Sequence, residues 1–119
     1  MKLTALRPIL WTQNMEESLK FYSEVLGFTI AEYNTDWQWA SLHHNGVEVM
    51  LSAFNDHSPQ KESLFTGSFY FTVVDVENLW MDFKTKTKVC YPLETFDWGM
   101  REFAIYDPNG YILQFGEEI

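Results

Sequence analysis

The sequence is poor in positive charge and in cysteine, and both shortages exclude classes of protein. Eight Lys and Arg residues stand against 17 Asp and Glu residues, for a formal net charge of −9 over 119 residues. Nucleic acids and anionic lipid surfaces are bound through a basic face, so neither a nucleic-acid partner nor a membrane partner is expected. The single cysteine, Cys90, excludes a disulfide bond within the chain.

Long apolar runs are also missing. No run approaches the about 20 residues that a membrane-spanning helix requires. The segment from Met1 to Pro8 lacks the apolar core of a signal peptide. Together with the lone cysteine, these features predict a cytoplasmic protein.

Aromatic residues, by contrast, are abundant. They make up 18% of the sequence, and apolar residues make up 46%, which is enough for the core of one compact domain. Aromatic side chains beyond the needs of a core often line a ligand site or an interface. The acidic balance suits a cationic ligand, and solubility alone explains it equally well.

The hydrophobic pattern predicts the same order of elements twice. In the first half we expect a strand, a helix and three strands at 7–12, 15–25, 28–33, 37–43 and 47–53. In the second half the same order is expected at 68–74, 76–83, 89–93, 98–106 and 111–115. Asn14 and Asp75 are predicted N-caps of the two helices and lie 61 residues apart, which indicates an internal duplication.

This pattern predicts an α+β fold of two tandem βαβββ modules in one domain over 1–119. Module one covers about 5–54, a polar linker about 55–65, and module two about 66–119. We expect the modules to form a curved mixed sheet that lines a cleft, with the helices on its convex side. A groove between repeats is a common place for a ligand.

Three segments carry a resemblance to a known family. Residues 18–22, 25–28 and 107–111 are similar to motifs of the vicinal oxygen chelate superfamily, which includes glyoxalase I, extradiol dioxygenases and bleomycin resistance proteins. The resemblance covers essentially the whole chain and implies the tandem βαβββ fold. It also implies where a divalent metal would be held in the superfamily's enzymes, by His and Glu side chains on the first and fourth strands of each module.

The four corresponding positions of this chain hold different residues: Arg7, Met50, Ser68 and Gln114. None is a His or a carboxylate, and a guanidinium repels a cation. His43 and His44 flank a predicted hairpin turn, and His57 falls in the linker. We therefore expect no metal, no cofactor and no catalytic residue. The alternative is a metal-dependent lyase, isomerase or oxygenase with an atypical set of ligands.

Within the superfamily, the chain most resembles the bleomycin resistance proteins. The carrying segments are 98–104 with 107–110, 6–10 and 47–52. Those proteins are acidic, metal-free homodimers that sequester a cationic, aromatic antibiotic in clefts between two chains. The resemblance thus implies a small-molecule ligand and a homodimer, in which exchange of elements between chains is one arrangement.

We predict that seven residues bind this ligand: Trp37, Trp39, Glu48, Tyr70, Trp98, Glu102 and Gln114. Indole faces attract cations, and carboxylates add charged hydrogen bonds. Other roles are open: the indoles at 37 and 39 could pack in a dimer interface, and the two Glu could pair with Arg7 and Arg101. A structural dimer whose own side chains fill the cleft is a third possibility.

Overall fold

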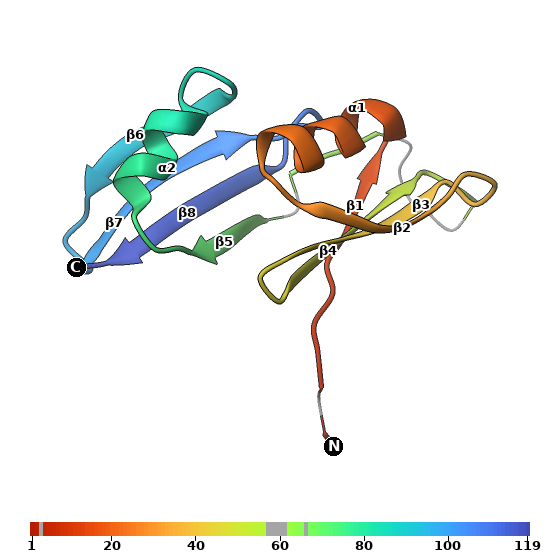
Figure 1. Cartoon of the computed structure of the whole chain (residues 1–119), viewed down its shortest axis with the longest axis horizontal. Helices are drawn as coiled ribbons and strands as arrows, with labels where there is room; N and C mark the ends of the chain where they lie inside the picture. Colours follow the sequence, from red (N-terminus) through yellow and green to blue (C-terminus); the bar gives the residue numbers. More distant parts are fainter. Residues whose placement is uncertain (3, 57–61, 66) are drawn as a thin grey trace. The chain divides into compact units, whose positions relative to one another are not determined.

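The computed structural model describes residues 1–2, 4–56, 62–65 and 67–119. The chain divides into two compact units, Met1–Ser63 and Leu64–Ile119. Each unit holds one four-stranded mixed sheet, with a helix over one face (Figure 1). The predicted α+β class and the repeated βαβββ order are confirmed. The predicted linker residue His57 lies outside the described residues, as do its neighbours at 58–61.

The first unit contains four strands: β1 (Ile9–Thr12), β2 (Thr29–Asn34), β3 (Trp39–His44) and β4 (Val47–Ala53). Their order in the sheet is β1-β4-β3-β2, and β1 runs parallel to β4. The helix α1 (Met15–Lys20) continues as the π-helix η1 (Phe21–Val25). Its predicted cap is confirmed, because the Asn14 side chain accepts the Glu17 N–H at 3.0 Å.

The pleat divides this sheet into an apolar and a polar face. Five strand residues are at most 3% exposed and form the core with Tyr22 of η1: Leu10, Ala40, Leu42, Val49 and Leu51. Because successive strand residues point to opposite faces, the residues between them lie on the face away from α1. This outer face carries Trp39, Ser41, His43, Glu48 and Met50.

The second unit repeats the arrangement with β5 (Ser68–Thr72), β6 (Lys88–Thr95), β7 (Met100–Tyr106) and β8 (Ile112–Glu118). The order is β5-β8-β7-β6, with β5 parallel to β8, and α2 (Val76–Phe83) contacts β7 and β8. Aromatic rings from α2 and from the sheet pack together in the core of this unit. Phe103 and Phe115 stack with centroids 5.3 Å apart, and Phe83 meets Phe115 edge-on at 5.5 Å.

The predicted strand over 37–43 begins too early. Strand β3 starts at Trp39, and Trp37 lies in a turn in which Gln38 has a positive φ of 52°. The Asn34 side chain stabilises this turn, because its Oδ1 accepts the Trp37 N–H at 2.9 Å. Trp37 is therefore 77% exposed and does not share the strand face of Trp39.

The predicted side-chain cap of the second helix is also wrong. Asp75 precedes α2 with φ 60° and makes no side-chain cap hydrogen bond. The carboxylate of Glu117 on β8 takes its place, accepting the N–H groups of Asp75 at 3.0 Å and Val76 at 3.1 Å. A negative group at a helix N-terminus is stabilised by the helix dipole, so the cap comes from a distant strand.

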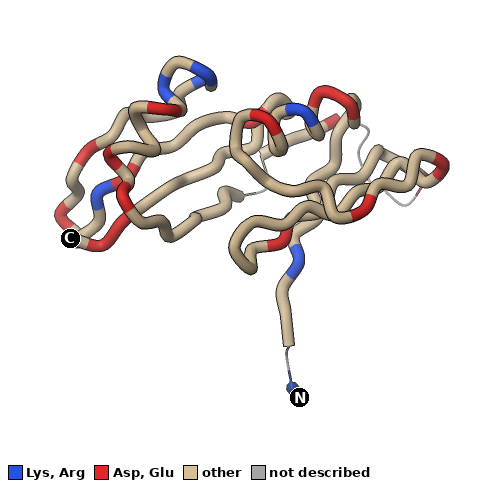
Figure 2. The backbone as a smooth tube through the Cα atoms, viewed as in Figure 1, with Lys and Arg blue, Asp and Glu red and all other residues tan. Residues whose placement is uncertain are grey.

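Acidic residues are spread over both units, and basic residues are few (Figure 2). Within the described ranges, no helix combines the length and the apolar character needed to cross a membrane.

Candidate functional site

The polar face of the second sheet gathers side chains from all four of its strands. Tyr70 on β5 lies opposite Gln114 on β8, which lies opposite Ala104 on β7, which lies opposite Tyr91 on β6. Residues paired in this way point to the same side of a sheet. Glu102, two residues before Ala104, faces the same side. We call Tyr70, Tyr91, Trp98, Glu102 and Gln114 the Glu102 cluster.

Three aromatic side chains donate hydrogen bonds to the Glu102 carboxylate. Tyr70 Oη donates to Oε1 at 3.0 Å, and Trp98 Nε1 donates to the same oxygen at 3.1 Å. Tyr91 Oη donates to Oε2. Glu102 is only 2% exposed. Both of its oxygens act as acceptors, which is how a carboxylate, rather than a carboxylic acid, satisfies its surroundings.

Two further hydrogen bonds join Gln114 on β8 to this network. Gln114 Nε2 donates to Tyr91 Oη at 2.8 Å, and Ser68 Oγ donates to Gln114 Oε1 at 2.6 Å. The Tyr91 hydroxyl therefore accepts a hydrogen bond from Gln114 and donates one to Glu102. Sequence reasoning missed Tyr91, although a strand was expected over 89–93. The two register shifts in the β6–β7 pairing hide its face from a simple alternation count.

The two tyrosines keep their protons well above neutral pH. Burial first, and then the hydrogen bond to Glu102, raise the pKa of Tyr70 to about 12. Burial, followed by the hydrogen bond to Glu102, likewise raises the pKa of Tyr91 to about 12. Both hydroxyls are therefore available as donors over the physiological range.

A glycine makes room for one of these donors. Gly116 on β8 lies opposite Glu102, and a Cβ atom built on it would lie 1.9 Å from Tyr70 Oη. No two such atoms approach so closely, so any larger residue at 116 would displace the end of the Tyr70 ring. The absence of a side chain at this position lets the hydroxyl reach the carboxylate.

The rings of the cluster turn their polar edges inward and leave ring surface in solvent. Trp98 is 67% exposed and Tyr70 is 43% exposed. Trp98 also stacks on Phe96, with centroids 4.6 Å apart and an angle of 11° between the planes. A stacked and hydrogen-bonded indole is held in one orientation. The result is a fixed, exposed aromatic surface above a buried carboxylate.

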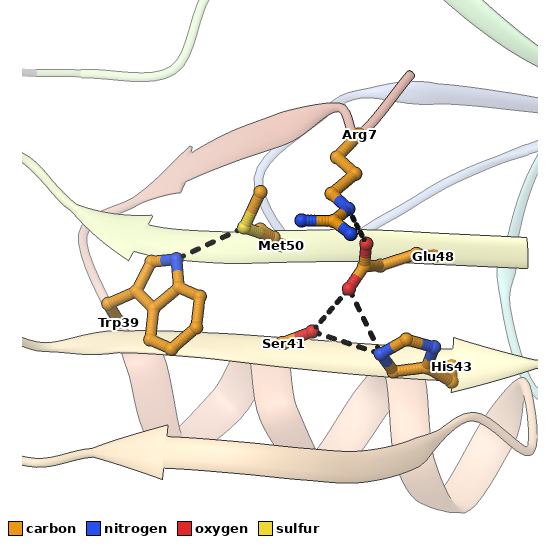
Figure 3. Close-up of polar contacts among 6 residues, drawn as sticks. All are labelled: Arg7, Trp39, Ser41, His43, Glu48 and Met50. Atoms are coloured by element: carbon orange, nitrogen blue, oxygen red, sulfur yellow. Dashed lines mark hydrogen bonds and ion pairs between the residues drawn. The ribbon is translucent and has the colours of Figure 1, made fainter. Parts of the chain in front are cut away.

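The polar face of the first sheet is organised around Glu48 (Figure 3). Arg7 Nε lies 2.5 Å from Glu48 Oε2, and His43 Nε2 lies 3.0 Å from Oε1. Ser41 Oγ donates to Oε1 at 2.9 Å. On the same face, Trp39 Nε1 donates to Met50 Sδ at 3.3 Å. Glu48 thus has a permanent cation as its partner.

The structure brings four of the seven predicted ligand-binding residues together: Tyr70, Trp98, Glu102 and Gln114. Trp39 and Glu48 share the polar face of the first sheet, and Trp37 stands apart in its turn. Of the two salt bridges considered, the one between Arg7 and Glu48 is present. Arg101 instead lies 2.6 Å from Glu77 through Nη2 and donates to Thr95.

The positions implied for metal ligands do not fit a metal centre. Met50 and Gln114 occupy equivalent places, because Met50 pairs with Ile9 and Ser41 as Gln114 pairs with Tyr70 and Ala104. The thioether is bonded to an indole, and the amide is bonded to Ser68 and Tyr91. Across the described residues, no three His, Cys, Asp or Glu side chains converge where they could hold a metal ion.

Comparisons with known proteins agree with this architecture. The model of the family described as the glyoxalase/bleomycin resistance protein/dioxygenase superfamily matches residues 4–115. No curated protein matches the sequence.

Several solved structures have the same fold. An integron cassette protein from the mobile metagenome of the Halifax Harbour sewage outfall is 25% identical, with a TM-score of 0.79 over 97% of this chain and 99% of its own. A lactoylglutathione lyase from Agrobacterium tumefaciens is 18% identical, with a TM-score of 0.76 over 98% and 96% of the two chains. A glyoxalase/bleomycin resistance protein/dioxygenase from Nocardioides is 16% identical, with a TM-score of 0.75 over 100% and 85%.

Proposed function

The chain belongs to the glyoxalase/bleomycin resistance protein/dioxygenase superfamily, and from this premise we propose that it is a metal-free small-molecule-binding protein. Its ligand is a flat aromatic molecule, and a positive charge on the ligand favours binding. The observation that carries this proposal is the Glu102 cluster, in which three aromatic donors are fixed on one buried carboxylate while Trp98 and Tyr70 keep ring surface exposed.

The chemistry of the cluster supports binding rather than turnover. Its hydrogen-bond donors are already used within the protein, so the surface left for a ligand is mostly aromatic. Stacking on such a surface depends on ring shape, and cations gain from the negative face of indole and phenol rings. The two hydroxyls beside the Glu102 carboxylate belong to Tyr70 and Tyr91, and their pKa values of about 12 disfavour the phenolate that a nucleophile would need.

We further propose that the protein acts as a homodimer, with the ligand held at the dimer interface. Exposed apolar side chains that belong to the cluster or lie near it in the sequence support this arrangement. Phe65, Val74 and Trp98 are each at least 67% exposed, and solvent-exposed groups of this kind often mark an interaction surface. Exchange of elements between the two chains is one way to build such a dimer.

Calorimetric titration tests this function. The wild-type protein is titrated with metal-free bleomycin and, separately, with 10-methylacridinium, a flat permanent cation. We expect binding of at least one probe. Trp98→Ala should weaken that binding by about tenfold or more, since one stacked ring contributes about 1–3 kcal/mol.

The matched control is Tyr33→Ala, which removes an aromatic side chain that is 39% exposed on β2 of the other unit. It should leave the affinity unchanged. A wild-type protein that gives neither heat nor a thermal shift with either probe at high concentration would contradict the proposal.

A second function rests on a different observation. His43 and Glu48 lie 3.0 Å apart and are both residue types that ligate metals. A metal-dependent lyase, isomerase or oxygenase with an atypical ligand set would use them. It predicts a stoichiometric divalent metal in protein purified without chelators, which elemental analysis measures. The guanidinium of Arg7, 2.5 Å from Glu48, makes this the weaker candidate.

A further inference from the structure

The buried carboxylate of Glu102 has no cationic partner in the described part of the chain. The nearest basic residue in sequence, Arg101, is engaged by Glu77 and Thr95. Buried charges in proteins are normally paired, because removal of a carboxylate from water is expensive. Here the negative charge is held only by the hydroxyls of Tyr70 and Tyr91 and by the indole N–H of Trp98.

These hydrogen bonds also change the rings that donate them. An O–H or N–H group that donates to an anion is polarised toward it, and electron density moves into the attached ring. The face of that ring then becomes more negative and attracts a cation more strongly. Because three rings share one carboxylate, its charge is conveyed to the exposed aromatic surface of Trp98 and Tyr70 without the carboxylate itself being exposed.

Resting on the proposed function, we propose that Glu102 is the specificity-determining positioning residue of the Glu102 cluster. It makes the exposed rings select flat cationic aromatic ligands over neutral ligands of the same shape. Glu102 does not touch the ligand. It fixes the orientation of the three rings, and its unpaired charge is balanced when a cation stacks on them. A ligand with an aromatic quaternary nitrogen satisfies both requirements.

The high pKa values of the two tyrosines are consistent with this role. With pKa values of about 12, both hydroxyls stay protonated at neutral and mildly alkaline pH, so the two donors persist throughout the physiological range. The selectivity for cations should therefore not vary between neutral and mildly alkaline pH.

The test compares two probes of nearly identical shape on three proteins. The probes are 10-methylacridinium, a permanent cation, and acridine, measured as the neutral base in mildly alkaline buffer. The proteins are the wild type, Glu102→Gln and the control Asp82→Asn. Asp82 is exposed on α2 and pairs with Lys86, so its variant removes one negative charge from the same unit at a distance from the cluster.

We expect the wild type to bind the cation at least about tenfold more tightly than the neutral probe, which corresponds to about 1.4 kcal/mol. Glu102→Gln should bring this ratio close to one and change the affinity for acridine by less than about twofold. Asp82→Asn should keep the wild-type ratio. Should Glu102→Gln fail to fold, Tyr70→Phe keeps the ring and the carboxylate but removes one donor, and should lower the ratio by about threefold.

Three results would overturn the inference. Equal losses for both probes in Glu102→Gln would mean that Glu102 is merely structural. A wild type that binds the neutral probe as well as the cation would leave the binding function intact and remove the selectivity. A wild type that binds neither probe would remove the proposed binding function itself, and the inference with it.

Discussion

The polar faces of the two sheets are built on the same plan and hold a central carboxylate in opposite ways. In the first unit, Glu48 is paired with the guanidinium of Arg7, which is 60% exposed at its side chain. In the second unit, Glu102 is surrounded by neutral aromatic donors. The first face is thereby neutralised within the protein. Among the described residues, the carboxylate of the second face has no cationic partner and lies beneath exposed rings.

The largest expected effect comes from removal of each carboxylate in turn. Glu102→Ala leaves three donors without their common acceptor and should lower the free energy of unfolding by about 2–3 kcal/mol. Glu48→Ala breaks an ion pair whose Arg7 side chain is 60% exposed, and it should lower the free energy of unfolding by about 1 kcal/mol or less. Chemical denaturation of both variants measures the difference. Equal losses would show that the two carboxylates are held alike.

A smaller effect is expected at the glycine that admits Tyr70. Gly116→Ala places a Cβ atom where the Tyr70 hydroxyl lies, so the ring must move away from Glu102. We expect a loss of about 1–2 kcal/mol in unfolding free energy, together with a fall in the pKa of Tyr70 toward its ordinary value of 10.

The matched variant in the first unit is Ser52→Ala, because Ser52 pairs with Trp39 on β3 as Gly116 pairs with Glu102 on β7. It should be nearly neutral, since the Ser52 hydroxyl bonds only to the adjacent Ala53 carbonyl at 3.2 Å. A Gly116→Ala protein that keeps the raised tyrosine pKa would contradict the close approach.

The last effect appears only in alkali. The pKa values of Tyr70 and Tyr91 are raised in the folded protein from 10 to about 12, so the unfolded chain loses these protons first as pH rises. The stability linked to the two hydroxyls is present in full below about pH 10 and is lost between about pH 10 and 12.

Across that window, the melting temperature should fall more steeply with pH for the wild type than for a Tyr70→Phe/Tyr91→Phe double variant. The difference in phenolate absorbance between the wild type and the double variant would identify the two tyrosines that lose their protons last. A wild type and double variant with the same decline would mean that these tyrosines titrate like free ones.

Local signals explain how much of the fold the sequence could predict. Alternating polar and apolar residues located the strands, and turn residues located their ends. Asn45 and Gly46, for example, have positive φ values of 48° and 83° and form the predicted hairpin turn. Asn14 was recognisable as a cap because its partner is three residues away. Glu117 was not, because it reaches the start of α2 from another strand.

The same distinction applies to the candidate site. Alternation placed Tyr70, Glu102 and Gln114 on one face, because each lies in a regular strand. It failed for Trp37, where the Asn34 side chain ends the strand pattern, and for Tyr91, where register shifts intervene. No pattern in the sequence could distinguish a Glu102 paired with Arg101 from one held by aromatic donors, since that depends on distances between strands.

The most direct test is a nuclear magnetic resonance titration of the wild-type protein with 10-methylacridinium, in which the indole N–H signals of Trp98 and Trp39 are followed together. Trp98 reports on the bond to Glu102, and Trp39 on the bond to Met50 in the other unit. We predict that the Trp98 signal shifts saturably while the Trp39 signal stays in place. A shift of Trp39 alone, or of neither signal, would contradict the assignment of ligand binding to the Glu102 cluster.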